Sequence, residues 1–274
     1  MVLPPPSPHE VEHIRSAIRR NIFWVACLVV GLLVASTYCS GESKHSGKRR
    51  PERAVASAVA ALVVWSLLYI DMKDPVYDPK TEYAKKFGED AKWKNLGGML
   101  GHCCYYTIQT LYLTAVYHTL CAAGNWMGYT QLQELCHQMA MFVATDGIGL
   151  TVLWYGLNWC EPKWQAIRRL WVAEGHPYGL IATIVHVPTF VLAFIDLLLI
   201  KERDFLLEVN PRLSAQVQAI AIYAGCYIVF LVINKQVSGV YPVGLPRLAR
   251  SSCPFMVCLP VALVVCPFGA VPFS

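Results

Sequence analysis

Charged residues are scarce in this sequence. Only 15% of its 274 residues are Asp, Glu, Lys or Arg, whereas a soluble domain carries about 25%. The hydrophobic share is 55%, and it is concentrated in several long apolar runs. This combination is typical of an integral membrane protein. We therefore expect membrane lipids to be the partners that surround the chain.

The sequence also lacks the patterns of a zinc site and of a nucleic-acid-binding surface. Its 11 cysteines include no pair of CxxC motifs, and most lie in apolar runs, where cysteine behaves as a small hydrophobe. We expect no disulfide framework, no metal and no cofactor. The net charge of +5 lies in loops between apolar runs, which indicates membrane topology rather than nucleic-acid binding.

Six apolar runs predict membrane helices. They cover residues 22–36, 54–70, 96–122, 135–157, 177–200 and 217–233. The predicted fold class is all-α, a multi-pass transmembrane helix bundle. Residues 253–274 are also apolar, but their four prolines oppose a regular helix. A seventh span, a membrane-embedded coil and an error of gene prediction stay open for this stretch.

The runs divide the chain into five segments. These are a disordered, polar N-terminus (1–21), two N-terminal membrane helices (22–70), a polar loop (71–95), a membrane core (96–245) and an apolar, Pro-rich tail (246–274).

Loop charge predicts how the bundle is oriented. Loops on the side of the N-terminus hold 15 Lys and Arg, and loops on the opposite side hold 8. The richer side, which includes the N-terminus, is expected to be cytosolic. The membrane itself is expected to be that of the endoplasmic reticulum, another endomembrane or the plasma membrane. The opposite side collects 41–53, 123–134 and 201–216, although the basic loop 41–53 works against the bias.

The run 177–200 carries two ionisable side chains, His186 and Asp196. Such groups are costly at membrane depth, so each is a functional-site candidate. Thr183 and Thr189 lie three residues either side of His186 and share its helical face. The alternative is a histidine that only hydrogen-bonds a neighbouring helix.

Two other runs carry polar groups. The run 96–122 has a polar stripe that lipid cannot satisfy, so this face must turn towards other helices. The stripe consists of Thr107, Thr110, Thr114 and His118. Asp146 lies in the middle of the fourth run. It is either a second intramembrane site or a residue facing water where Gly147 breaks the run.

Three ordered patches carry a family resemblance. They are WKNLGGMLGHCCYYTIQTLY (93–112), HVPTFVLAFID (186–196) and YIVFLVINKQVSGVYPVGL (227–245). Together they resemble the family of androgen-induced-gene-one and androgen-dependent TFPI-regulating proteins. The first patch is similar to the Trp-Lys-x-Leu-Thr segment that begins a helix in this family. The second is similar to the family's histidine helix, and the third to its Tyr-Pro segment.

The resemblance implies an intramembrane hydrolase of fatty acid esters of hydroxy fatty acids. In that family a threonine is the nucleophile and a histidine is the base. His186 matches the family's histidine. The threonine position holds Gly97 or, counted back from Gln109, His102.

Other residues near the altered position can supply the nucleophile. Thr107 and Cys103 are the nearest hydroxyl and thiol, and His186 is the base that would activate them. Asp146 is the carboxylate we expect to orient the imidazole.

Two other functions stay open. One is a non-catalytic protein that binds or scaffolds membrane lipids. The other is a small transporter whose polar path is formed by His102, His118, Asp146 and His186. The sequence shows no inverted repeat of the kind many transporters have.

Overall fold

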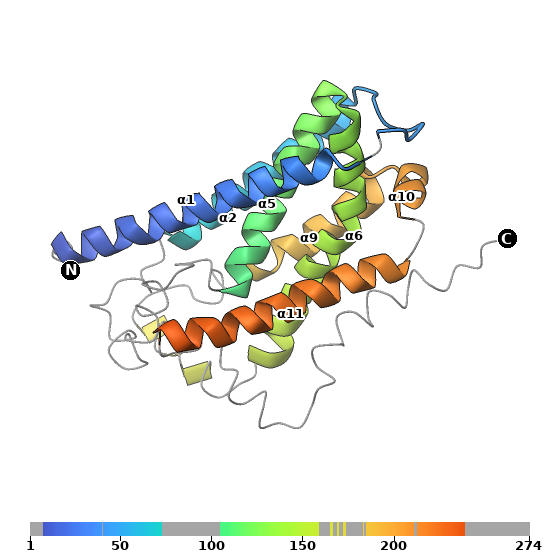
Figure 1. Ribbon diagram of the computed structural model, residues 1–274. Helices are drawn as coiled ribbons and strands as arrows, with labels where there is room; N and C mark the ends of the chain where they lie inside the picture. Colours follow the sequence, from blue (N-terminus) through green and yellow to red (C-terminus); the bar gives the residue numbers. More distant parts are fainter. Residues whose placement is uncertain are drawn as a thin grey trace.

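The computed structural model of the chain is a set of packed helices (Figure 1). The residues it describes are 8–39, 41–72, 105–158, 165–166, 169, 172–173, 183, 185–210 and 213–238. Within these residues there are seven α-helices and no strand, which confirms the all-α fold class for this part of the chain. The predicted loop beyond residue 72 and the tail 246–274 lie outside it.

The elements follow the predicted runs closely. The helices are α1 (Pro8–Ser36), α2 (Pro51–Met72), α5 (Tyr106–Met127), α6 (Thr130–Leu153), α9 (Pro188–Ile195), α10 (Arg203–Val209) and α11 (Leu213–Ser238). Two π-helical turns extend α6 and α9. They are η3 (Trp154–Asn158) and η4 (Asp196–Ile200).

Among the residues that the structure describes, three segments are long and apolar enough to cross a membrane. They are Pro51–Ile70, Thr130–Gly156 and Gln216–Gln236, each near the roughly 20 residues that span a bilayer core. Asn21–Ser36 and Pro188–Ile200 are shorter apolar helices. These three segments make the chain a candidate multi-pass membrane protein.

The structure corrects three boundaries of the sequence interpretation. The loop expected over 123–134 is mostly helical, because α5 continues to Met127 and α6 begins at Thr130. Helix α1 begins at Pro8, so the prediction of disorder over 1–21 is wrong from that residue on. Proline is tolerated in the first turn of a helix, and residues 9–20 contain neither Gly nor Pro to interrupt it. Helix α10 also forms within the charged segment 201–216, which was expected to be a loop.

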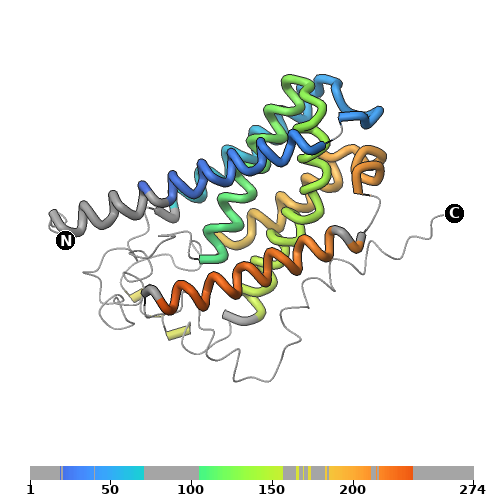
Figure 2. Tube along the Cα trace, in the orientation of Figure 1, coloured from blue at the N-terminus to red at the C-terminus, as the bar shows by residue number. Residues whose placement is uncertain are grey.

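Helix α5 is the most buried of the helices and packs against both α2 and α6. Figure 2 shows α5 and α6 as an antiparallel pair. The apolar cluster between α5 and α6 includes Leu113, Val116 and Leu120. A second cluster, between α5 and α2, includes Val64 and Leu111. In a membrane such side chains hold helices together through close van der Waals packing rather than through removal from water, and this packing on two sides fixes the position of α5.

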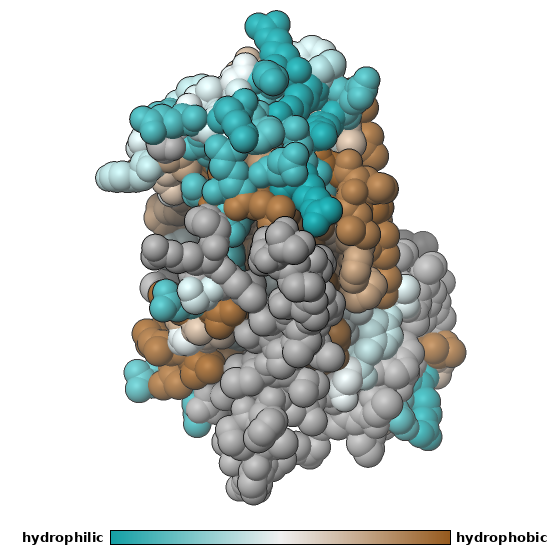
Figure 3. Space-filling model, turned by 90° about the vertical axis from the view of Figure 1, so that its right-hand side faces the viewer, coloured by the Kyte–Doolittle hydropathy of each residue, from teal (hydrophilic) through white to brown (hydrophobic). Residues whose placement is uncertain are grey.

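Hydrophilic residues gather at one end of the molecule, with patches of hydrophobic residues beside and below them (Figure 3). At this end α5 turns into α6 through Gly128, which has a φ of 71°. A Cβ on Gly128 would also lie 3.2 Å from the carbonyl oxygen of Gly47, so both conformation and space favour glycine. We call residues 41–50, 125–134 and 201–210 the polar end.

Hydrogen bonds fasten the loop 41–50 to the helices at the polar end. The Glu134 carboxylate accepts from the amides of Gly41 and Ser43, each at 2.9 Å. The Gln133 side chain accepts from the Gly47 amide and donates to the Lys48 carbonyl, each at 2.8 Å. The loop therefore has a defined conformation that rests on two buried side chains of α6.

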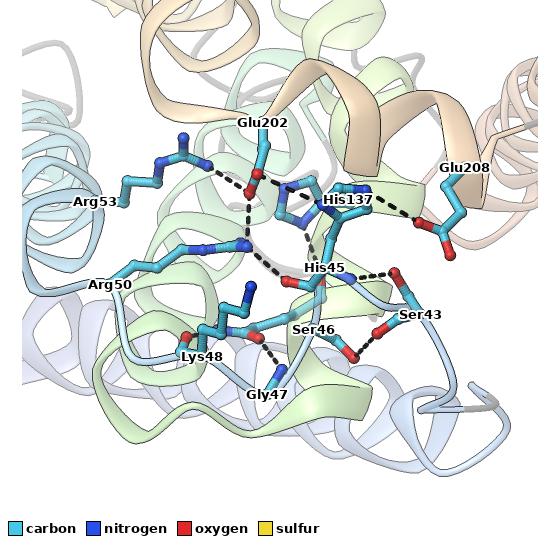
Figure 4. Close-up of polar contacts among 11 residues, drawn as sticks. Ser43, His45, Ser46, Gly47, Lys48, Arg50, Arg53, His137, Glu202 and Glu208 are labelled. Carbon is cyan, nitrogen blue, oxygen red and sulfur yellow. Dashed lines mark hydrogen bonds and ion pairs between the residues drawn. The ribbon is translucent and has the colours of Figure 1, made fainter.

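Ion pairs connect the same loop to α10 (Figure 4). The carboxylate of Glu202 lies 2.6 Å from Arg50 and 3.3 Å from Arg53. The two nitrogens of the His45 ring each lie 3.6 Å from a carboxylate, one of Glu202 and one of Glu208. The structure thus places three segments that the sequence assigned to one side of the membrane at one end of the bundle.

Candidate functional site

The ring of His186 lies in the helical packing, with only 6% of the residue exposed. It stacks on the indole of Trp154, with ring centroids 4.0 Å apart and planes inclined by 9°. The backbone carbonyl of His186 accepts a hydrogen bond from the Thr151 hydroxyl. The C-terminal end of α6 therefore fixes both the backbone and the ring of this histidine.

Thr107 lies at the edge of the same ring. Its Oγ1 is 3.3 Å from Nε2 of His186, although the two residues are far apart in the sequence. Thr107 is the second residue of α5, and His186 lies two residues before the start of α9. The structure therefore brings together two of the residues that the sequence singled out as nucleophile and base.

Asp146 lies beside this pair and contacts a different residue. Its carboxylate accepts a hydrogen bond of 2.5 Å from the Tyr106 hydroxyl. Within the described residues it makes no hydrogen bond to His186, where the sequence led us to expect it. Tyr106 precedes Thr107 in the chain, so Asp146 fixes the start of α5 rather than the imidazole.

Gly147 explains how α6 and α9 come close enough to form the site. A Cβ at this position would lie 2.9 Å from the backbone oxygen of Thr189, so the two helices touch through their backbones. Helix α6 continues through Gly147, and Asp146 is only 5% exposed. The alternative in which Gly147 breaks the helix and exposes Asp146 to water is therefore wrong.

The other predicted site residues, His102 and Cys103, lie outside the described residues. The contact of Trp154 with His186 was missed by sequence reasoning, since an aromatic residue at the end of an apolar run is typical of a membrane interface. Tyr106 was only one of many polar residues in the run 96–122, and nothing in the sequence paired it with Asp146. Both contacts depend on how α5, α6 and α9 cross, which the sequence pattern does not contain.

A groove of about 540 Å³ runs between α6 and α11. Its lining includes Leu135, Gln138, Met139 and Phe142 of α6, and Gln216, Ala219, Ile222, Tyr223 and Cys226 of α11. At one end the Tyr223 hydroxyl donates to Gln109, at 3.2 Å, and the Tyr223 ring lies 6.5 Å from that of Tyr106. This end of the groove therefore approaches the start of α5, where Thr107 lies.

The described residues contain no group of three or more His, Cys, Asp or Glu side chains that could hold a metal ion. A comparison of the chain with protein-family models, curated proteins and solved structures finds no match. The fold and the site therefore define the class: an all-helical candidate membrane protein with a half-buried threonine beside a buried histidine, and an apolar groove nearby.

Proposed function

We propose that the chain is an integral membrane ester hydrolase in which Thr107 is the nucleophile and His186 is the general base. The observation that supports this is the 3.3 Å contact between Thr107 Oγ1 and His186 Nε2. A hydroxyl is a weak nucleophile until an adjacent base accepts its proton, and such contacts are often loose without substrate.

The geometry supports a two-step reaction. His186 Nε2 accepts the hydroxyl proton as Thr107 Oγ1 attacks the ester carbonyl, and the same proton then passes to the departing alkoxide. Water releases the acyl group from Thr107 in the second step, again with His186 as base. This cycle requires the neutral tautomer of His186 with its proton on Nδ1, while Trp154 keeps the ring in one plane.

The groove between α6 and α11 supports a substrate with an acyl chain. Apolar side chains line most of it, and burial of each methylene contributes about 0.8 kcal/mol. Phe142 and Tyr223 pack edge to face across it, with centroids 5.3 Å apart. The family resemblance adds the substrate class, fatty acid esters of hydroxy fatty acids.

The proposal places six helices in an endomembrane or plasma membrane, with the N-terminus in the cytosol. The buried polar face of α5 suits this placement. Thr110, Thr114 and His118 are each at most 3% exposed, and lipid could not satisfy them. The polar end would then face the lumen or the cell exterior.

Hydrolysis by the purified full-length chain tests the proposal. We expect turnover of a long-chain fatty acid ester of a hydroxy fatty acid, and a fall of about 10²–10⁴-fold in His186→Ala and in Thr107→Val. Thr145→Val is the matched control, because the Thr145 hydroxyl donates to the Met141 carbonyl of its own helix. Within the part of the chain that the structure describes, this hydroxyl makes no hydrogen bond to Thr107 or His186. Equal rates in wild type, His186→Ala and Thr107→Val would contradict the assignment.

The second candidate function is a lipid-binding protein without catalysis. The observation that favours it is the groove between α6 and α11. This candidate predicts that an acyl lipid co-purifies with the chain and that an activity-based probe of the fluorophosphonate type does not label it. His186-dependent labelling would exclude this candidate. Substitution of Ala219 by Trp in α11 fills the groove, and should release the lipid while leaving the Thr107–His186 contact in place.

A further inference from the structure

A second buried polar cluster lies between α5, α6 and the end of η4, and the proposed hydrolysis makes no use of it. The Lys201 ammonium donates a hydrogen bond of 3.2 Å to the sulfur of Cys121. It also lies 3.9 Å from the Asp196 carboxylate and 4.8 Å from the centre of the Tyr117 ring. Tyr117 donates to the same carboxylate at 2.6 Å.

Lys201 is held in its charged form by these neighbours. Burial lowers the pKa of the ammonium, but Asp196 and the nearby thiols raise it by more, so the pKa lies above its usual value. The side chain is only 1% exposed. A buried ammonium that points at a sulfur stabilises the thiolate over the thiol.

Cys121 has a second sulfur as its neighbour. Cys136 lies opposite it across the α5–α6 turn, and both residues belong to the same buried cluster between these two helices. Helices α5 and α6 lie close together near these two cysteines. One turn nearer the polar end, a Cβ on Gly124 would lie only 3.3 Å from the Leu132 side chain.

We propose that Cys121 and Cys136 form a redox-active dithiol, in which Lys201 stabilises the reactive thiolate of Cys121 and Cys136 is the resolving thiol. Both cysteines are free in this structure. Oxidation would tie α5, which carries Thr107, to α6, whose extension η3 begins with Trp154. The site is distinct from the Thr–His pair, so it stands whether or not the chain is a hydrolase.

The chemistry balances with hydrogen peroxide as oxidant. The Cys121 thiolate attacks one peroxide oxygen, the O–O bond breaks, and the departing hydroxide takes a proton to become water. The resulting sulfenic acid is attacked by the sulfur of Cys136, which forms the S–S bond and releases a second water. Two thiols and one peroxide thus give one disulfide and two waters, with two electrons passing from sulfur to oxygen.

Access and compartment both suit this reaction. The cysteines are 1% and 3% exposed, and peroxide is small and uncharged, so local opening of the bundle is enough to admit it. The cluster lies towards the polar end. In the proposed orientation that end faces the lumen or the exterior, where disulfides persist.

Peptide mapping of the full-length chain tests the proposal. The protein in detergent is exposed to hydrogen peroxide, denatured, alkylated and digested without reductant. We expect a Cys121–Cys136 linked peptide that a reductant removes. In Lys201→Met the linkage should form roughly tenfold more slowly or worse, because the thiolate loses its cation. Lys201→Arg keeps the charge and should retain most of the rate.

Three other cysteines serve as internal controls. Cys27 and Cys226 are exposed and report that oxidant reached the protein. Cys39 is buried without such a cation, and burial, followed by the nearby Glu134 carboxylate, raises the pKa of its thiol, so it should remain reduced longest. The proposal is overturned if Cys121 and Cys136 both stay alkylatable after Cys27 and Cys226 are oxidised, or if Lys201→Met reacts at the wild-type rate.

One further variant keeps the test decisive if Lys201→Met does not fold. In Cys136→Ser the disulfide cannot form, so Cys121 should accumulate as sulfenic acid and react with a dimedone-type probe. Cys121→Ser should abolish that labelling. Labelling that persists in Cys121→Ser, or that is absent from Cys136→Ser, would show that Cys121 is not the reactive thiol.

Discussion

The ring of His186 is fixed from two directions. Trp154 covers one face at a centroid distance of 4.0 Å, and Thr107 meets the edge at Nε2, 3.3 Å away. An imidazole held in this way loses little conformational freedom when it accepts a proton. The indole thus acts through the histidine, and its contribution is to position the ring.

Trp154→Leu tests this positioning role. Leucine keeps an apolar side chain but removes the flat face, and a stack of this kind contributes about 0.5–1.5 kcal/mol beyond its buried area. We expect kcat for ester hydrolysis to fall by up to about tenfold with a smaller change in KM. Trp154→Phe keeps a stacking ring and should recover most of the rate. A variant that changes KM alone would contradict the role.

At the scale of single residues, the sequence could name His186 and Thr107 but not how they are paired. His186 was identifiable because an ionisable group in an apolar run is rare and costly. Thr107 was one of several polar residues on its face. Its contact with His186, and the contact of Asp146 with Tyr106, depend on the rotation of α5 about its axis relative to α6 and α9.

Among the elements, the crossing of α6 and α9 positions the histidine. The helices meet where Gly147 faces the backbone of Thr189, and each is followed by a π-helical turn, η3 or η4. Such turns are frequent at functional sites because they change the direction of side chains within a continuous helix. Here η3 begins with the residue that covers the His186 ring.

Gly147→Ala should separate the two helices. The added Cβ would lie 2.9 Å from the backbone oxygen of Thr189, and backbone cannot move aside as a flexible side chain can. We expect overpacking to cost about 1–3 kcal/mol, with a lower thermal midpoint in detergent and less ester hydrolysis, because His186 moves with α9.

Gly225→Ala in α11 is the matched control. No described atom lies within 4 Å of a Cβ at this position, and alanine is the better helix former by up to about 1 kcal/mol. Its thermal midpoint should equal or exceed that of the wild type. The explanation fails if Gly147→Ala is as stable as Gly225→Ala.

Apolar runs predicted the existence of α1, α2, α5, α6, α9 and α11, because length and composition decide whether a helix can be buried. They did not predict α10, which has few buried side chains and is held by contacts at the polar end. The interpretation of Gly147 as a break also failed. A glycine that ends a helix and one that admits a neighbouring backbone look alike in a sequence.

For the whole molecule, the polar end determines how the basic loop 41–53 should be interpreted. Its five cations oppose the predicted orientation, but Arg50 and Arg53 both face Glu202 within the same end. Arg50 also donates a hydrogen bond of 2.5 Å to the His45 carbonyl. These two charges therefore serve the fold and weigh less as signals of membrane topology.

Glu202→Gln should loosen this end of the molecule. The substitution leaves Arg50 and Arg53 facing each other without their shared carboxylate, and Arg50 is only 13% exposed. Exposed ion pairs contribute up to about 1 kcal/mol to the free energy of unfolding, and breaking a buried ion pair costs about 3–5 kcal/mol. For this half-buried pair we expect a loss of about 1–2 kcal/mol, measured as a lower unfolding midpoint.

Glu208→Gln provides the comparison, because in the described part of the chain the carboxylate of Glu208 pairs only with His45, at 3.6 Å. Its loss should stay below about 0.5 kcal/mol, as for an exposed pair. High salt should reduce the difference in unfolding midpoint between the two variants only slightly, since salt screens partly buried charges much less than exposed ones. If both variants unfold at the wild-type midpoint, the arginines of this loop are not structural, and their full charge must be counted against a cytosolic N-terminus.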